Sequence, residues 1–183
     1  NNRLNIEWLL LGMLALMWGS SYLLINIAVR EIPPLTLVAA RVSGAACFLY
    51  CIMRWRGESL PSGFATWRML LLQSFFTSIG AWSFLAWGQQ YVSAGLASVL
   101  NSTSPLFVFF ITAYITQHEP TNRLKLLGAV LGLCGVVLIV GLDALNGIGL
   151  QVLGQLACLS GAMLYACAAI YGKRFTHISA LAT

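Results

Sequence analysis

The sequence predicts an all-α, polytopic membrane protein, a bundle of about six transmembrane helices. Of its 183 residues, 59% are hydrophobic and 8% are charged, whereas a soluble domain carries about 25% charged residues. The apolar residues also gather in six stretches, each close to the roughly 20 residues that a helix needs to cross a bilayer. A chain with so little polar surface requires lipid as its solvent.

Short breaks separate the six apolar stretches. In order, the stretches are residues 8–29, 34–53, 68–91, 95–117, 124–142 and 150–172. The breaks between them are residues 30–33, 54–63, 92–94, 118–123 and 143–149. Most of these breaks contain proline, glycine or charged residues, which end apolar helices. None is long enough to form a separate soluble domain.

Basic residues are distributed unequally between the two sides of this six-span arrangement. Eight of the ten fall on the side of the N-terminus, Arg30 falls on the other side, and Arg41 lies inside a span. Because loops rich in Lys and Arg stay in the cytoplasm, both ends of this chain are predicted to be cytoplasmic. We expect a multi-pass protein of a bacterial inner (plasma) membrane.

The composition also excludes several classes of protein. The net charge of +5 is spread singly or in pairs between apolar stretches, unlike the clustered basic surface of a nucleic-acid-binding protein. The five cysteines lie in apolar stretches without a Cys-x-x-Cys motif or a nearby histidine, so we expect no disulfide, metal or cofactor. An enzyme is not expected either, because its catalytic groups must lie within reach of one another. His118, His177 and Glu119 lie at helix ends, and Asp143 lies on the opposite side of the membrane.

A weak internal repeat relates the first and last spans. Residues 12–19 read Gly-x-Leu-Ala-x-x-x-Gly, and the same pattern recurs at residues 154–161; a register five residues longer, which pairs Trp18 with Tyr165, fits nearly as well. Because five helices separate the copies, the second copy is inverted in the membrane, as in many secondary transporters. We expect a first repeat over residues 1–149 and the start of a second over residues 150–183. The offset predicts a full chain of roughly 300 residues and ten spans.

The span at residues 95–117 contains the most informative polar segment, Asn-Ser-Thr-Ser-Pro at residues 101–105. Pro105 removes the backbone donor for the carbonyl of Asn101. A freed carbonyl beside amide and hydroxyl groups at mid-membrane can bind a solute or an ion. The alternative is a packing kink in which the hydroxyls bond to their own helix.

Two tryptophans are predicted to lie near the middle of the membrane. Trp82 belongs to a polar stripe with Ser74, Ser78 and Gln89, and Trp18 lies at a similar depth in the first span. A single tryptophan at this depth can face lipid. Two of them near polar stripes on neighbouring helices indicate a cavity for a partly apolar solute.

Arg41 is the one charge well inside a span. A charge there is costly and suggests function, but an arginine can also extend toward the interface or bind carbonyls of a neighbouring helix end. We assign Arg41 a structural role, together with Pro105. Glu119 fits the positive end of the following helix dipole, and Gly128 and Gly132 allow close helix packing, within the protein or in a homodimer.

Several motifs extend along nearly the whole chain in a fixed order. They are residues 18–22 (Trp-Gly-Ser-Ser-Tyr), 34–41, 91–97 (Tyr-Val-Ser-Ala-Gly-Leu-Ala), 105–107 (Pro-Leu-Phe), Glu119 and the glycine-rich span at 124–142. In this order they resemble the EamA-type branch of the drug/metabolite transporter superfamily. The resemblance implies ten helices in two inverted repeats around a central cavity, lined partly by helices 1, 3, 4 and 6. It also implies export or exchange of amino acids, other metabolites or drugs. The related four-helix multidrug transporters carry a membrane glutamate in helix 1, and residues 16–18 contain none here.

These inferences predict a secondary transporter that moves a small organic solute across the lipid bilayer by alternating access. The competing class is a non-transporting membrane assembly or sensor subunit that uses its glycine faces for contacts. The predicted solute contacts combine aromatic faces with amide and hydroxyl groups, a mixture that suits a solute with an apolar body and a polar head. They are Trp18, Ser78, Trp82, Asn101, Ser102 and Tyr165.

Overall fold

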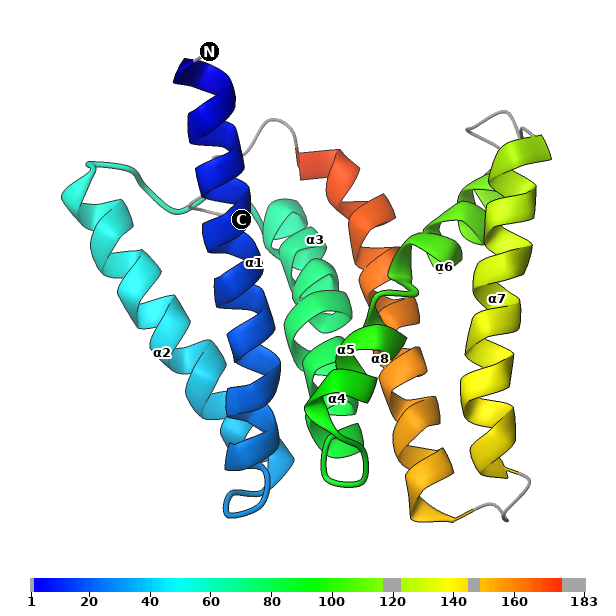
Figure 1. The fold of residues 1–183 in the computed structure, drawn as a ribbon. Coiled ribbons are helices and arrows are strands. Elements are labelled where there is room, and N and C mark those ends of the chain that lie inside the picture. Colours follow the sequence, from blue (N-terminus) through cyan, green and yellow to red (C-terminus); the bar gives the residue numbers. More distant parts are fainter. Residues whose placement is uncertain (1, 117–122, 145–148, 176–183) are drawn as a thin grey trace.

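The computed structural model describes residues 2–116, 123–144 and 149–175, and every regular element in these ranges is a helix (Figure 1). Five helical spans among them are long and apolar enough to cross a membrane. They are Ile6–Ala28, Pro34–Trp55, Phe64–Gly88, Ala94–Ala113 and Leu150–Phe175. A further, shorter apolar helix covers Leu124–Leu138. The prediction of an all-α, polytopic membrane bundle is confirmed.

The first two spans are the helices α1, Asn2–Ala28, and α2, Pro34–Trp55. The two helices meet at a tight turn, and Pro34 occupies the first position of α2, where its missing N–H and fixed φ are tolerated. The Asn26 side chain donates to the carbonyls of Gln89, at 3.0 Å, and Val92, at 3.1 Å. These bonds fasten the end of α1 to the turn that follows the third span.

The third span is one continuous rod built from three elements. It begins as α3, Phe64–Ser74, widens into the π-helical segment η1, Phe75–Ala81, and ends as α4, Trp82–Gly88. A π-helical turn is wider than an α-turn and changes the register of the residues that follow it. The face presented by α4 therefore cannot be extrapolated from α3 at the usual helical spacing.

The fourth span is interrupted near its middle. The helix α5, Ala94–Asn101, ends before residues 102–103, and α6, Ser104–Phe110, continues into the π-helical segment η2, Ile111–Thr116. The break lies just before Pro105, which cannot continue an α-helical hydrogen-bond ladder. Figure 1 shows that α6 leaves α5 at an angle and runs toward α7.

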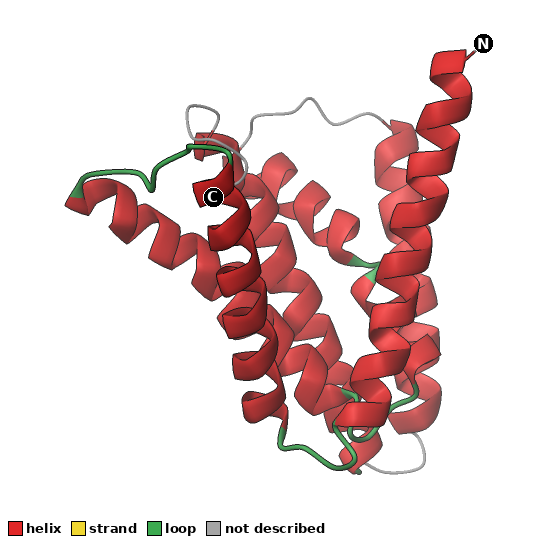
Figure 2. Ribbon diagram, turned by 90° about the vertical axis from the view of Figure 1, so that its left-hand side faces the viewer, coloured by secondary structure: helices red, strands yellow, loops and turns green. Residues whose placement is uncertain are grey.

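The last two helices are α7, Arg123–Ala144, and α8, Leu150–Gly172, which ends in the short 3₁₀ segment η3, Lys173–Phe175. α8 contacts α3, η1, α4, α5, α6 and α7, and it forms the centre of the described bundle (Figures 1 and 2). In its most apolar window 44% of the residues are buried, against 6% in α1 and 6% in α2. α1 and α2 therefore expose most of their surface in this structure.

Glycines allow α4 and α8 to approach closely. A Cβ atom on Gly88 would lie 2.7 Å from the carbonyl oxygen of Gly154 and 2.7 Å from the Cys158 sulfur. A Cβ atom on Gly154 would lie 2.9 Å from Cβ of Tyr91. Neither position has room for a side chain, so this close contact fixes α4, and the side chains it carries, against α8.

Candidate functional site

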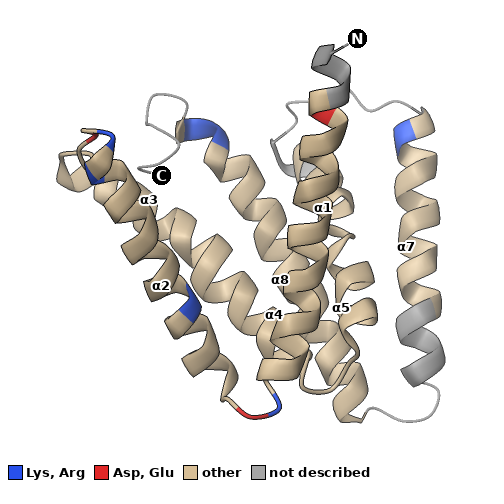
Figure 3. Ribbon diagram, turned by 60° about the vertical axis from the view of Figure 1, so that its left-hand side comes forward, with Lys and Arg blue, Asp and Glu red and all other residues tan. Residues whose placement is uncertain are grey.

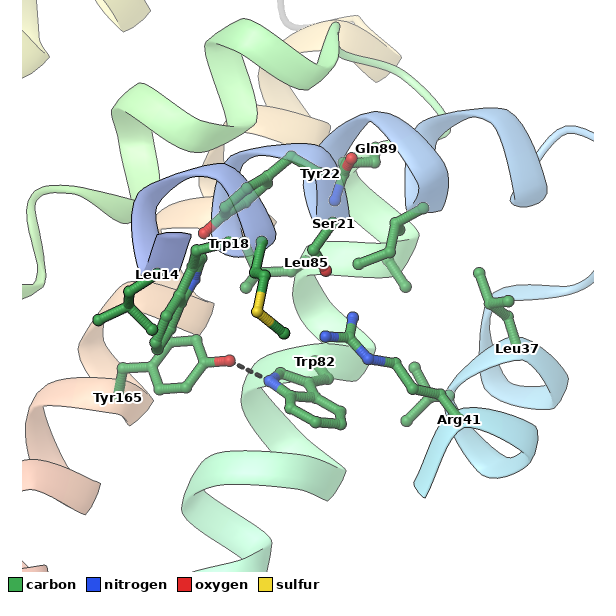
Figure 4. A pocket seen from close by; sticks show the side chains of 14 residues that line it. Leu14, Trp18, Ser21, Tyr22, Leu37, Arg41, Trp82, Leu85, Gln89 and Tyr165 are labelled. Carbon is green, nitrogen blue, oxygen red and sulfur yellow. Dashed lines mark hydrogen bonds between the residues drawn. The ribbon is translucent and has the colours of Figure 1, made fainter. Parts of the chain in front are cut away.

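The candidate site is a cavity of about 290 Å³ enclosed by α1, α2, α4 and α8. Its described wall is mostly apolar, with four aromatic residues and one charged residue. The lining side chains are Leu14, Met17, Trp18, Ser21, Tyr22, Ile25, Leu37, Val38, Arg41, Trp82, Leu85, Ala86, Gln89 and Tyr165 (Figure 4). An apolar pocket with a few polar groups is the usual form of a small-molecule site.

Three side chains from three helices form a connected chain along this wall. The Arg41 guanidinium of α2 lies over the ring of Trp82 of α4, with its carbon 4.3 Å from the ring centroid. The Trp82 indole N–H donates to the hydroxyl of Tyr165 of α8 (Figure 4). A cation over an indole face is attracted by the ring quadrupole. The chain fixes the orientation of the Trp82 ring between its two partners.

Tyr22 connects the cavity to the interrupted fourth span. Its hydroxyl accepts a hydrogen bond from the Asn101 amide nitrogen at 2.6 Å. The Tyr22 side chain is buried and belongs to the cluster of Leu85, Leu100 and Cys158. Asn101 therefore acts on the cavity wall through Tyr22.

Gln89 is the most deeply buried polar residue of the wall, at 2% exposed. Its backbone N–H bonds to Leu85, but neither atom of its side-chain amide has a hydrogen-bond partner in the described structure. A buried amide without a partner costs about 1–3 kcal/mol. The amide is thus available to a polar group that enters the cavity.

The structure brings three of the six predicted solute contacts to one cavity, namely Trp18, Trp82 and Tyr165. Asn101 reaches it only through Tyr22. Ser78, within η1, lies off the wall and its hydroxyl faces that of Thr77 at 3.4 Å. Ser102 is exposed, and its hydroxyl donates back to the carbonyl of Ser98 at 2.8 Å.

The hydroxyls around the break in the fourth span are bonded to their own helix. Ser104 donates to the carbonyl of Asn101 at 2.7 Å, so the carbonyl that Pro105 leaves without a backbone donor has a partner. Thr103 donates to the carbonyl of Leu100 at 2.6 Å. These bonds correspond to the packing-kink alternative for the hydroxyls. The expectation that the Asn101 carbonyl is free for a solute does not hold in this structure.

The residues assigned structural roles are placed as follows. Arg41 lies on the cavity wall, and Pro105 lies in the first turn of α6. A Cβ on Gly132 would lie 2.8 Å from Leu106 of α6, whereas Gly128 has open space around it. Gly132 thus serves packing within the chain. Glu119 falls outside the described residues.

Sequence reasoning left three polar residues of the wall unassigned. Ser21 and Tyr22 belong to the motif at residues 18–22, and Gln89 belongs to the polar stripe of the third span. Each was visible as a polar residue in an apolar span. Only the tertiary arrangement of the helices shows that they border one cavity. No cluster of His, Cys, Asp or Glu suited to a metal ion occurs among the described residues.

The fold and the cavity together define a class, a polytopic membrane protein whose helices enclose an aromatic, largely apolar pocket. Comparison with known proteins then narrows this class. The model of the EamA-like transporter family matches residues 6–141. The chain belongs to the EamA-like transporter family.

Curated relatives agree with this assignment. The chain is 29% identical over 164 residues to the uncharacterized transporter YoaV of Bacillus subtilis, covering 89% of this chain and 56% of the relative. It is 28% identical over 163 residues to the uncharacterized inner membrane transporter YedA of Escherichia coli K12, covering 89% and 52%. An uncharacterized transporter of Archaeoglobus fulgidus is 32% identical over 170 residues, covering 91% and 57%. The chain thus spans about half the length of these relatives. No solved structure matches it.

Proposed function

We propose that the protein is a secondary transporter that binds a small organic solute in the cavity between α1, α2, α4 and α8 and moves it by alternating access. The observation that carries the proposal is the cavity itself, in which Trp18, Trp82 and Tyr165 surround a space of about 290 Å³. This is close to the lower limit of ligand pockets, roughly 300 Å³. An amino acid, another metabolite or a small drug suits such a space.

The proposal includes a full chain of about ten spans in two inverted repeats, with residues 1–149 as the first and residues 150–183 opening the second. The family membership, together with relatives about twice as long as this chain, supports it. Alternating access would then consist of the two repeats rocking about the cavity. The protein would act without a cofactor and without catalysis.

Flux through the full-length protein tests the proposal. Purified protein in liposomes should take up one or more labelled solutes from a panel of amino acids, other metabolites and drugs. Trp18→Ala removes an aromatic face from the wall, so it should weaken the apparent affinity about 2- to 12-fold. Trp8→Ala, on the same helix but with Trp8 69% exposed and off the cavity, should have no effect.

The competing function gives a different result. A sensor or assembly subunit would bind solutes without accumulating them, so saturable binding with no flux across the whole panel would contradict transport. Equal effects of Trp18→Ala and Trp8→Ala on the apparent affinity would mean that the transported solute does not bind in this cavity.

A further inference from the structure

Among the described residues that line the cavity, Arg41 is the only charged one. It lies in the second turn of α2, about 10 Å from the end of the helix at Pro34. Figure 4 shows its guanidinium directed into the cavity, toward Ser21 of α1. The guanidinium carbon lies 4.3 Å from the centroid of the Trp82 ring. No described carboxylate pairs with it.

The contact with Trp82 leaves most of the hydrogen-bonding capacity of Arg41 unused. A guanidinium that stacks over a ring is attracted through its face, while its five N–H donors lie in its plane. Two parallel N–H groups on one edge match the two oxygens of a carboxylate. An unpaired ion inside a membrane span is costly, so an entering anion gains the attraction without first displacing a protein carboxylate.

Two further polar groups face the same space. The Gln89 amide is buried at 2% exposed with both polar atoms unpartnered, and Figure 4 shows it beside Tyr22. The Ser21 hydroxyl points into the cavity opposite Arg41 in the same view. Both the amide N–H and the hydroxyl can donate to an acceptor, which adds to the preference for an oxygen-rich group.

The rest of the wall suits an uncharged body. Leu14 and Trp18 of α1 lie near Tyr165 of α8, which lies next to the Trp82 ring (Figure 4). Met17 of α1 also lines the cavity. The described wall contains no aspartate or glutamate, so it offers no carboxylate to an ammonium group. The cavity is therefore amphipathic and positively charged. It combines the Arg41 guanidinium and a few hydrogen-bond donors with aromatic and aliphatic side chains.

The geometry points to a small organic anion as the solute, a carboxylic acid with an aromatic or branched apolar body, whose carboxylate binds the in-plane donors of Arg41. Gln89 supplies a second polar contact to the head group. This inference rests on the proposed transport function and names the substrate class for the same cavity. Arg41 is then a ligand as well as a structural residue.

Matched pairs of probes test the inference. Affinities for purified full-length protein are measured by calorimetry with 3-phenylpropanoate and 4-methylpentanoate, each beside its primary amide. Each carboxylate should bind at least about tenfold more tightly than its amide, because a charge-assisted bidentate bond is about twice as strong as a neutral one. Arg41→Gln should bring this ratio close to one, and Arg41→Lys should retain part of it. Gln89→Met should weaken both members of a pair.

The control variant is Arg30→Gln, which removes the same charge from the exposed turn between α1 and α2 and should leave the ratio unchanged. Equal binding of carboxylates and amides by the unaltered protein would overturn the inference, as would a preference that survives in a folded Arg41→Gln protein. The variant Trp18→Ala tests separately whether the solute binds in this cavity at all. If Trp18→Ala weakens both probes while Arg41→Gln keeps the preference, the cavity remains the site and only the anion assignment is lost.

Discussion

Polar side chains are scarce on the cavity wall, and three of them, Tyr22, Trp82 and Tyr165, are held by hydrogen bonds to a side chain of another helix. The Tyr22 hydroxyl of α1 accepts from Asn101 of α5, and the Trp82 N–H of α4 donates to Tyr165 of α8. In a membrane each such bond replaces one that water would otherwise make. These bonds fix the tyrosine and tryptophan rings, so that the wall presents defined faces to a solute.

The Asn101–Tyr22 bond gives a prediction at the scale of single residues. Asn101→Ala and Tyr22→Phe each remove the same hydrogen bond, worth about 0.5–1.5 kcal/mol, so each should weaken solute affinity about 2- to 12-fold. Because both act through one contact, the double variant should lose no more than either alone. Apparent affinities from uptake by proteoliposomes provide the measurement.

Ser102→Ala is the matched control for this prediction. Ser102 adjoins Asn101 but is exposed, and its hydroxyl bonds to the carbonyl of Ser98 within the same span. We expect its loss to leave solute affinity unchanged. Additive losses in the Asn101/Tyr22 double variant would show that the two residues act independently, and a large effect of Ser102→Ala would return that residue to the solute site.

At the scale of elements, hydropathy and turn residues predict the spans closely. The predicted stretches 34–53 and 150–172 correspond to Pro34–Trp55 and Leu150–Gly172. Pro105 also indicates the interruption of the fourth span. The spans follow from the hydrophobicity of each segment, and the interruption follows from the missing backbone N–H of proline. Both are local properties of the sequence.

The π-helical segment η1, Phe75–Ala81, marks the limit of that reasoning. It contains no proline and no other evident signal, yet it changes the register between the first half of the span and Trp82. A stripe drawn at α-helical spacing therefore placed Ser78 beside Trp82 at the solute, whereas the structure leaves Ser78 off the cavity wall. Trp18 and Tyr165 were predictable from depth and chemistry. The positions of Arg41 and Gln89 on one wall depend on tertiary packing, which the sequence does not show.

The close contact between α4 and α8 gives a prediction for the element scale. A methyl group on Gly88 would meet the Gly154 carbonyl oxygen at 2.7 Å, and a backbone atom cannot rotate away as a side chain can. Gly88→Ala should therefore push the helices apart and destabilise the protein by about 1–3 kcal/mol. The melting temperature of the purified full-length protein should fall.

Gly44→Ala is the control, since Gly44 is also inside a helix but has no atom within 4 Å of its added methyl. Alanine favours a helix over glycine, so this variant should melt at the same temperature or slightly higher. Equal melting temperatures for Gly88→Ala and the unaltered protein would mean that α4 and α8 do not pack this closely.

At the scale of the whole molecule, charge is concentrated at one end of the bundle. Figure 3 shows basic positions at the ends of α2, α7 and α8 that lie on the side of the N-terminus, and a basic position within the α2 span. The opposite end of the described chain carries the turn with Arg30 and Glu31. An unequal distribution of basic residues orients a protein during membrane insertion, because loops rich in Lys and Arg are retained in the cytoplasm.

This asymmetry predicts the orientation of the protein in the membrane. In a full-length background without native cysteines, single cysteines at Asn2, Ser62 and Ser179 should react only with reagents that reach the cytoplasmic side. A cysteine at Glu31, in the turn between α1 and α2, should react with a membrane-impermeant reagent added outside. The reason is the distribution of eight basic residues on one side and Arg30 alone on the other. Outside labelling at position 2 or 179 would contradict the six-span topology with both ends in the cytoplasm. Outside labelling at position 62, together with protection at position 31, would mean that the bundle has the opposite orientation in the membrane.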